Sequence, residues 1–252
     1  MIELRQLTVG YGNKAVLTDI NQQIEAGQMV CLLGANGAGK STLLRTLAGF
    51  QPPLSGHIFL QGRDLNSLSL MRRSRAVSVV LTEHIEVPYM CVEDLVGMGR
   101  SPYTGFFGSL SEEDRKVVDE AIGMVGISDL AQRSINTLSD GERQKAMLAK
   151  ALAQQTPVIL LDEPTAFLDF HAKVGTLRLM LRLAHETGKT ILLSTHDVEM
   201  AIQLSDLLWI VQEGTVTAGT TASLTADGTL GRFLQAEGIN YDETDHTLRI
   251  ES

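Results

Sequence analysis

The distribution of apolar residues divides the chain into segments with different periods. Short, largely apolar runs occur at residues 29–33, 77–81, 158–161 and 190–194. Such runs, bounded by polar residues or glycine, are typical of strands buried on both faces of a sheet. From 92 to 153 the apolar positions recur at helical spacing, and a second helical pattern from about 171 to 185 separates the last two runs. This alternation of strand and helix predicts an α/β fold with a mainly parallel sheet.

The two ends of the chain follow other patterns. Residues 2–30 predict β-structure, with a slip in the apolar alternation and a turn at residues 11–14. The segment after residue 224 is polar, with one candidate strand at 247–250. We expect a core of residues 1–83 and 157–224, an inserted helical segment at 84–156 and a C-terminal tail at 225–252.

Composition narrows the class of protein. The net charge is −9, whereas a general nucleic-acid surface needs an excess of Lys and Arg, and residues 72–75 form only a short basic cluster of the kind usual in a solvated turn. The two cysteines, Cys31 and Cys91, fit neither a disulfide framework nor a zinc site. No stretch approaches the roughly 18 apolar residues of a membrane span, and residues 1–5 do not resemble a signal peptide. We therefore expect a cytoplasmic protein that binds no nucleic acid.

The first apolar run leads into the most informative stretch of the chain. Residues 34–42 read Gly-Ala-Asn-Gly-Ala-Gly-Lys-Ser-Thr, which is the G-x-x-x-x-G-K-S spacing between a strand and a helix. Glycines let backbone N–H groups close around phosphates, and the helix adds the positive end of its dipole. Lys40 adds a charge for the outer phosphates, and the Ser41 hydroxyl is a ligand for Mg²⁺. The candidate triphosphate-binding residues are Gly34, Asn36, Gly37, Gly39, Lys40, Ser41 and Thr42.

Polar side chains follow two other apolar runs where the predicted strands end. Asp162 and Glu163 come directly after the run at 158–161, and His196 comes after the run at 190–194. Ligands bind at the carboxyl ends of strands in such sheets. There Asp162 is placed to hold Mg²⁺, and Glu163 to orient and deprotonate a water. His196 at this edge is placed to reach a γ-phosphate, although a lone histidine after a strand is more often structural.

Two further features have both a structural and a functional interpretation. Ser139 and Glu142 fit the capping box S-x-x-E at the start of a predicted helix, and local evidence favours that structural role. A helix N-terminus with a free hydroxyl is also an anion site. Tyr11 is either an ordinary turn aromatic or a ring that stacks on a nucleotide base.

In this order, the motifs resemble the ATP-binding subunit of ABC transporters over roughly residues 2–217. The resemblance implies a P-loop NTPase fold with a RecA-like core, an N-terminal antiparallel β subdomain and a helical insertion. It also implies ATP and Mg²⁺ as cofactors. By position, the matches are the adenine-stacking aromatic at Tyr11, the Walker A loop at 34–42, the signature motif at Ser139 and Gly141, the Walker B magnesium carboxylate at Asp162, the catalytic base at Glu163, the D-loop at Asp169 and the switch histidine at His196.

The chain departs from the family pattern at two places. Glu83 stands where the family usually has Gln, and Asp140 and Glu142 occur in a signature that usually reads L-S-G-G-Q. A carboxylate accepts hydrogen bonds and ligates a hard cation, but it cannot donate to a phosphate oxygen. We therefore expect Glu83 to take part in catalysis from the magnesium side of the site and to strengthen its hold on the metal.

Within the family, residues 99–102 and 139–144 resemble importers of iron–siderophore, haem and cobalamin complexes. The resemblance implies a homodimer with ATP at its interface, bound peripherally through permease subunits to the cytoplasmic face of the inner membrane and linked indirectly to a substrate-binding protein. Permease docking is expected near residues 100–103, with Phe106 and Phe107 beyond them. The leading hypothesis is an ATPase that binds and hydrolyses ATP to power import of an iron complex, a siderophore or haem, through the permease. The alternatives are a soluble ABC-type scaffold or assembly factor, for example in iron–sulfur cluster assembly, an importer of cobalamin or another metal, and a small-molecule kinase. A kinase would explain the phosphate loop alone.

Overall fold

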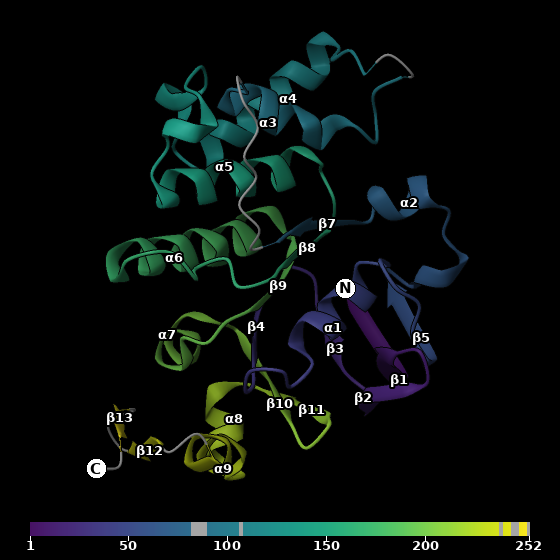
Figure 1. The fold of residues 1–252 in the computed structure, drawn as a ribbon, viewed down its shortest axis with the longest axis vertical. Coiled ribbons are helices and arrows are strands. Elements are labelled where there is room, and N and C mark those ends of the chain that lie inside the picture. Colours follow the sequence, from purple (N-terminus) through teal and green to yellow (C-terminus); the bar gives the residue numbers. More distant parts are fainter. Residues whose placement is uncertain (82–89, 106–107, 237–238, 243–246, 251–252) are drawn as a thin grey trace.

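The computed structural model describes residues 1–81, 90–105, 108–236, 239–242 and 247–250. Its centre is a six-stranded sheet with the strand order β11-β10-β4-β9-β8-β7 (Figure 1). The pairs from β10 to β7 are parallel, and β11 pairs antiparallel with β10. The predicted mainly parallel sheet is thus confirmed. Its strands are β4 (Met29–Leu33), β7 (Val77–Val80), β8 (Val158–Leu161), β9 (Thr190–Ser194), β10 (Leu207–Gln212) and β11 (Thr215–Gly219).

The continuous apolar runs reflect burial of this sheet on both faces. Successive side chains of a strand point to opposite faces. Along β4, Met29, Cys31 and Leu33 belong to one hydrophobic cluster, and Val30 and Leu32 belong to the other. The first cluster continues into the helical segment and α6 (Phe170–Thr187), and the second continues into α1 (Lys40–Leu47) and the N-terminal strands.

The N-terminal strands form a separate antiparallel sheet with the order β2-β1-β5-β6, in which β3 also pairs with β1. The slip in the apolar alternation has a structural cause. The register of β1 shifts against β2 between Leu7 and Val9, and against β5 between Arg5 and Thr8. Such bulges reverse the face to which the following side chains point. The strands are β1 (Ile2–Tyr11), β2 (Lys14–Ile20), β3 (Gln23–Ile24), β5 (Ser55–Leu60) and β6 (Arg63–Asp64).

A helical layer covers the β7–β8 side of the central sheet (Figure 1). A buried ion pair holds its N- and C-terminal parts together, because Arg100 Nε donates to Asp114 Oδ1 at 2.8 Å and Arg100 Nη1 donates to the Ala153 carbonyl at 2.8 Å. Apart from an isolated bridge between Cys91 and Ser134, the described part of this segment holds no β-pairing. Its helices, with the short α2 before them, are α2 (Leu70–Ser74), α3 (Val92–Gly97), α4 (Glu112–Met124) and α5 (Asp140–Ala153).

The C-terminal part is more structured than the sequence pattern predicts. The strand expected at 247–250 is present as β13 (Thr247–Ile250), paired with β12 (Ile239–Asp242). Before it, α9 (Thr229–Ala236) buries Leu230, Phe233 and Leu234 in the core. Their i, i+3, i+4 spacing is helical, but a helix of eight residues is too short for the period to stand out in the sequence. None of the helices in the described residues is long and apolar enough to cross a bilayer. The remaining helices are α7 (Val198–Leu204), α8 (Thr221–Ala226) and α9 (Thr229–Ala236).

Candidate active site

The loop between β4 and α1 wraps around its own lysine. Lys40 is 6% exposed, and its Nζ donates to the carbonyl oxygens of Gly34 at 2.5 Å and Ala35 at 3.1 Å. Gly39, which precedes α1, has φ = 110°, and a Cβ there would lie 2.7 Å from the Val16 side chain. Only glycine therefore allows the helix to begin at Lys40 with its ammonium group held inside the loop.

The end of β8 is bound to this loop through side chains from three elements. Strand β9 lies between β4 and β8, and its last residue, Ser194, donates from Oγ to Asp162 Oδ1 at 2.7 Å. Ser41 Oγ donates to the same carboxylate oxygen at 3.1 Å. Ser194 Oγ also accepts a hydrogen bond from the Glu163 N–H at 2.9 Å. The Ser194 hydroxyl, which the sequence analysis did not single out, thus holds Asp162 and Glu163 together, while Ser41 bonds Asp162 directly.

Glu163 and His196 face each other across the ends of β8 and β9. His196 Nε2 lies 2.5 Å from Glu163 Oε1, and both side chains are partly exposed to solvent. The backbone of Glu163 is left-handed, with φ = 47°. A non-glycine residue in this region costs about 1–3 kcal/mol and persists where surrounding contacts hold it in place. Here the hydrogen bond from its N–H to Ser194 is one such contact.

The structure brings Tyr11 beside the same loop. Thr42 Oγ1 donates to the Tyr11 hydroxyl at 3.2 Å, and Tyr11 is 52% exposed. A half-exposed ring next to a phosphate loop is available for stacking. Asn36 and Gly37 lie at the exposed tip of the loop. One edge of the molecule therefore holds Tyr11, residues 34–42, Asp162, Glu163 and His196.

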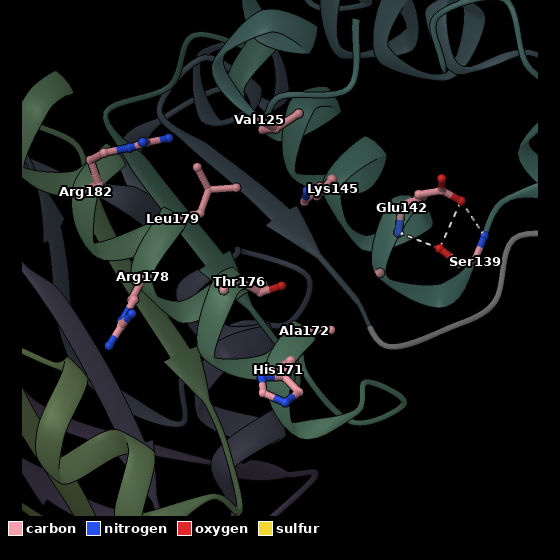
Figure 2. Close-up of a pocket in the computed structure, with 12 residues that line it drawn as sticks. Val125, Ser139, Glu142, Lys145, His171, Ala172, Thr176, Arg178, Leu179 and Arg182 are labelled. Atoms are coloured by element: carbon pink, nitrogen blue, oxygen red, sulfur yellow. Dashed lines mark hydrogen bonds between the residues drawn. The ribbon is translucent and has the colours of Figure 1, made fainter. Parts of the chain in front are cut away.

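Ser139 lies at the start of α5 and there makes the predicted capping box (Figure 2). The Ser139 N–H and Oγ–H donate to Glu142 Oε2 at 2.8 and 2.9 Å, and the Glu142 N–H donates to Ser139 Oγ at 3.3 Å. The hydrogen bonds from Ser139, first that of its backbone N–H, hold the pKa of the Glu142 carboxyl below its usual range. The cap therefore contains a charged acceptor where the family pattern has an amide.

A cavity of about 610 Å³ opens between this end of α5 and α6. It is lined by Ser139 and Gly141 and by the cationic side chains of Lys145, Arg178 and Arg182 (Figure 2). No hydrogen bond or ion pair between described residues joins Ser139, Gly141 or Asp169 to the loop at 34–42. Asp169 instead caps α6 by accepting from the Ala172 N–H at 2.9 Å.

Three predicted residues lie outside the described structure. Glu83, expected to act on catalysis and on the metal, belongs to the segment 82–89. Phe106 and Phe107, expected near the permease contact, are the other two. Their roles stay predictions.

Comparison with known proteins identifies relatives of the whole chain. Residues 17–166 match the family described as ABC transporter. The chain is 37% identical to an uncharacterised ABC transporter ATP-binding protein of Methanocaldococcus jannaschii, over 96% of this chain and 84% of the relative. It is 36% identical to the iron(3+)-hydroxamate import ATP-binding protein FhuC of Bacillus subtilis, over 88% of this chain and 82% of that protein.

A solved structure shares the fold. The ATP-binding cassette MJ0796, determined as a dimer in a post-hydrolysis state with ADP and Pi, superposes with a TM-score of 0.74. It is 27% identical in sequence, and the match covers 88% of this chain and 99% of the cassette.

Proposed function

Because this chain belongs to the ABC transporter family, we propose that it is the subunit that hydrolyses ATP to power import of an iron complex through a membrane permease. The observation that carries the proposal is the meeting of the phosphate loop, Asp162, Glu163 and His196 at one edge of the sheet. Phosphoryl transfer depends on positioning of the reacting groups and on stabilisation of negative charge, and these residues can provide both.

The loop residues bind and orient the triphosphate. The carbonyl oxygens of Gly34 and Ala35 hold the Lys40 ammonium, which exchanges these partners for the outer phosphate oxygens when nucleotide binds. The first N–H groups of α1 point toward the same phosphates and have no partner within the helix. Tyr11 stacks on the adenine ring.

Glu163 supplies the base. Its carboxylate accepts a proton from the attacking water, the water oxygen bonds to the γ-phosphorus, and the bond to the bridging oxygen of ADP breaks. His196, 2.5 Å from this carboxylate, orients it and donates toward the γ-phosphate. The hydrogen bond from the Glu163 N–H to Ser194 keeps the base at this edge of the sheet.

The oxygen donors at this edge fit Mg²⁺. Ser41 Oγ and Asp162 Oδ1 lie 3.1 Å apart, and hydroxyl and carboxylate oxygens are the ligands this hard cation prefers. No cluster of three His, Cys, Asp or Glu side chains occurs among the described residues, so phosphate oxygens and water would complete the shell. The bound ion would neutralise charge on the phosphates, and Glu83 is our further candidate ligand.

The second half of the site would come from another copy of the chain. Ser139 and Gly141 line an open cavity, and in the described part of the chain no hydrogen bond or ion pair joins them to their own phosphate loop. The dimeric state of the related cassette supports a head-to-tail homodimer, in which Ser139 and Gly141 meet the γ-phosphate bound by the partner. In that arrangement Asp169, which caps α6, lies near the shared nucleotide.

A groove beside α2 is our candidate site for the permease. Its volume is about 560 Å³, and it lies between the end of α1, α2 and the residues Ser101 and Pro102. Phe50, Leu70 and Met71 are 63%, 82% and 52% exposed and line it. Exposed apolar side chains gathered in this way mark an interaction site. The predicted docking loop contributes Ser101 and Pro102, while Phe106 and Phe107 lie outside the described residues.

The relatives support the cargo, and the location is part of the same proposal. The Bacillus subtilis relative is named for import of an iron(3+)-hydroxamate complex, which supports an iron complex as cargo. A peripheral subunit on the cytoplasmic face of the membrane would bind the permease there, and the permease would receive its cargo from a substrate-binding protein on the other side.

Co-expression with a candidate multi-span permease tests the proposal. We expect the chain to co-purify with the permease from detergent-solubilised membranes. Leu70→Ser with Met71→Ser should reduce this association at least tenfold, because it removes apolar surface from the groove. The control is Met124→Ser, which alters an exposed methionine that does not line the groove.

Full ATPase activity without any permease association would favour the soluble scaffold instead. A lower melting temperature of the Leu70→Ser, Met71→Ser variant alone would show that these side chains stabilise the fold.

A further inference from the structure

Helix α2 borders a second cavity, which differs from the groove in its chemistry. This cavity has a volume of about 590 Å³, and its polar lining includes Arg63, Arg72 and Arg75. Leu60 and Leu68 are nearly buried and form apolar parts of its wall. No acidic side chain lines it among the described residues. We call this site the arginine cavity.

Two of the three arginines are available to a ligand. Within the described part of the chain, the side chains of Arg63 and Arg72 make no hydrogen bond and no ion pair, and both residues are exposed. They come from different elements, since Arg63 begins β6 and Arg72 lies in α2. The fold therefore brings together two guanidinium groups whose charges repel, without a carboxylate to offset them.

The third arginine is held in place. Arg75 donates from Nε and Nη2 to the Pro102 carbonyl at 3.1 and 2.7 Å, and its guanidinium lies 4.7 Å from the centre of the Tyr103 ring. The guanidinium of Arg100 also lies over this ring, 4.0 Å from its centre. A guanidinium fixed by two hydrogen bonds loses less conformational entropy when it binds a further partner.

The local charge is opposite to that of the whole chain. Residues 61–81 contain four arginines and a single acidic residue, Asp64, whereas the whole chain carries −9. The Asp64 carboxylate is already engaged, with His57 Nδ1 at 2.7 Å and the Asn66 N–H at 2.8 Å. The arginine cavity is therefore a positive site on an acidic protein, and it attracts anions to one place.

We propose that the arginine cavity binds a phosphate group, carried either by a soluble phosphorylated molecule or by a phospholipid headgroup. All three cations are arginines, whose planar forks pair with two phosphate oxygens at once. Gln61 and Ser67 add hydrogen-bonding groups, and the leucines offer an apolar wall. The volume exceeds that of a bare phosphate and falls in the range of sites for small molecules.

The site is separate from the nucleotide site, because none of residues 34–42, Asp162, Glu163 or His196 lines it. Its test can therefore use the full chain with its phosphate loop saturated by ADP. The first probe is inorganic phosphate, followed through the arginine side-chain NMR signals. The second is a phosphatidylglycerol vesicle, followed by flotation against vesicles of phosphatidylcholine.

The key variant is Arg63→Gln with Arg72→Gln. The matched control is Arg115→Gln with Lys116→Gln, which removes two exposed charges from α4 and changes the net charge by the same amount. Loss of two charge-assisted hydrogen-bonding groups should weaken binding at least about tenfold in the key variant. The control should bind as the wild type does.

Shifts of the Arg63, Arg72 and Arg75 signals with phosphate would support a soluble ligand, and flotation with phosphatidylglycerol vesicles alone would support a lipid headgroup. The proposal is overturned if the wild type binds neither probe, or if the control loses as much affinity as the key variant. Since no permease is present, such a failure would leave the proposed transport function untouched.

Discussion

The two parts of the proposed ATP site differ in how complete they are within one chain. At the edge of the central sheet, Asp162 Oδ1 accepts hydrogen bonds from Ser41 and Ser194, and Glu163 already faces His196. At the start of α5, the hydrogen bonds that Ser139 makes with described residues lie within its own capping box, and it lines an open cavity. The fold of one chain assembles the first region. The second region offers a cavity but is not joined to the phosphate loop of the same chain by any described hydrogen bond.

This contrast suggests how nucleotide could control assembly. Nucleotide adds charge and hydrogen-bonding groups to the sheet edge. In the structure, Lys40 donates there to the carbonyl oxygens of its own loop. The α5 region gains only when a second copy brings its bound phosphates to the helix N-terminus. Each prediction below alters one region and follows the other.

The largest effect is expected at the sheet edge, from Glu163→Gln. The amide keeps the size of the side chain but cannot take a proton, so turnover should fall by about 10²–10⁴-fold. ATP should still bind and should now hold two copies together, which sharpens the contrast between the regions. Single-turnover assays and gel filtration with Mg-ATP check both outcomes. Monomer alone under these conditions would contradict the head-to-tail dimer.

An intermediate effect is expected at the α5 region, from Ser139→Arg. The longer side chain occupies the cavity beside Gly141 and adds charge where the partner's phosphates should approach, so ATP-dependent dimers should be lost. Nucleotide affinity of the monomer should change less than about twofold, since no described bond links Ser139 to the phosphate loop. Equilibrium binding of a fluorescent ATP analogue, with sedimentation of the same samples, measures both. A matching loss of monomer affinity would show that the regions are coupled within one chain.

The smallest effect concerns acid stability at the same end of α5. Hydrogen bonds from Ser139 lower the pKa of Glu142 in the folded chain, so the stability that Glu142 contributes is present above its unfolded pKa and lost as pH falls through the folded one. Glu142→Gln keeps an acceptor for the cap and does not titrate. The Glu142→Gln variant should therefore lose less stability than the wild type as pH falls through this acidic range.

Acid-unfolding curves followed by circular dichroism check this prediction. The control is Glu112→Gln, an exposed carboxylate in the first turn of α4 for which no hydrogen bond is found in the described structure. Equal shifts for the two variants would mean that net charge, and not the cap, sets the acid response.

Much of this architecture could be predicted from local pattern. The apolar runs and the loop at 34–42 identified the strands β4, β7, β8 and β9 and the beginning of α1. The two-residue and 3.6-residue periods are properties of the local backbone, so they can be read without knowing what packs against the element. The helix α9 was missed because its eight residues are too few for the helical period to stand out.

The sequence by itself determined which residues can do the chemistry: a glycine loop ending in Lys40, carboxylates after β8 and a histidine after β9. Only the tertiary structure decided which of them meet. Ser41 and Asp162 are 121 positions apart in the chain, and they bond because the parallel strands β4, β9 and β8 end at the same edge of the sheet, where Ser194 at the end of β9 donates to the same carboxylate oxygen. It likewise placed Arg72 and Arg75, from the basic cluster at 72–75, together with Arg63 in the lining of one cavity. The sequence gives the type of each side chain directly. Which side chains on different strands lie close together depends on the order of the strands, and that order follows from how the whole sheet buries its two faces.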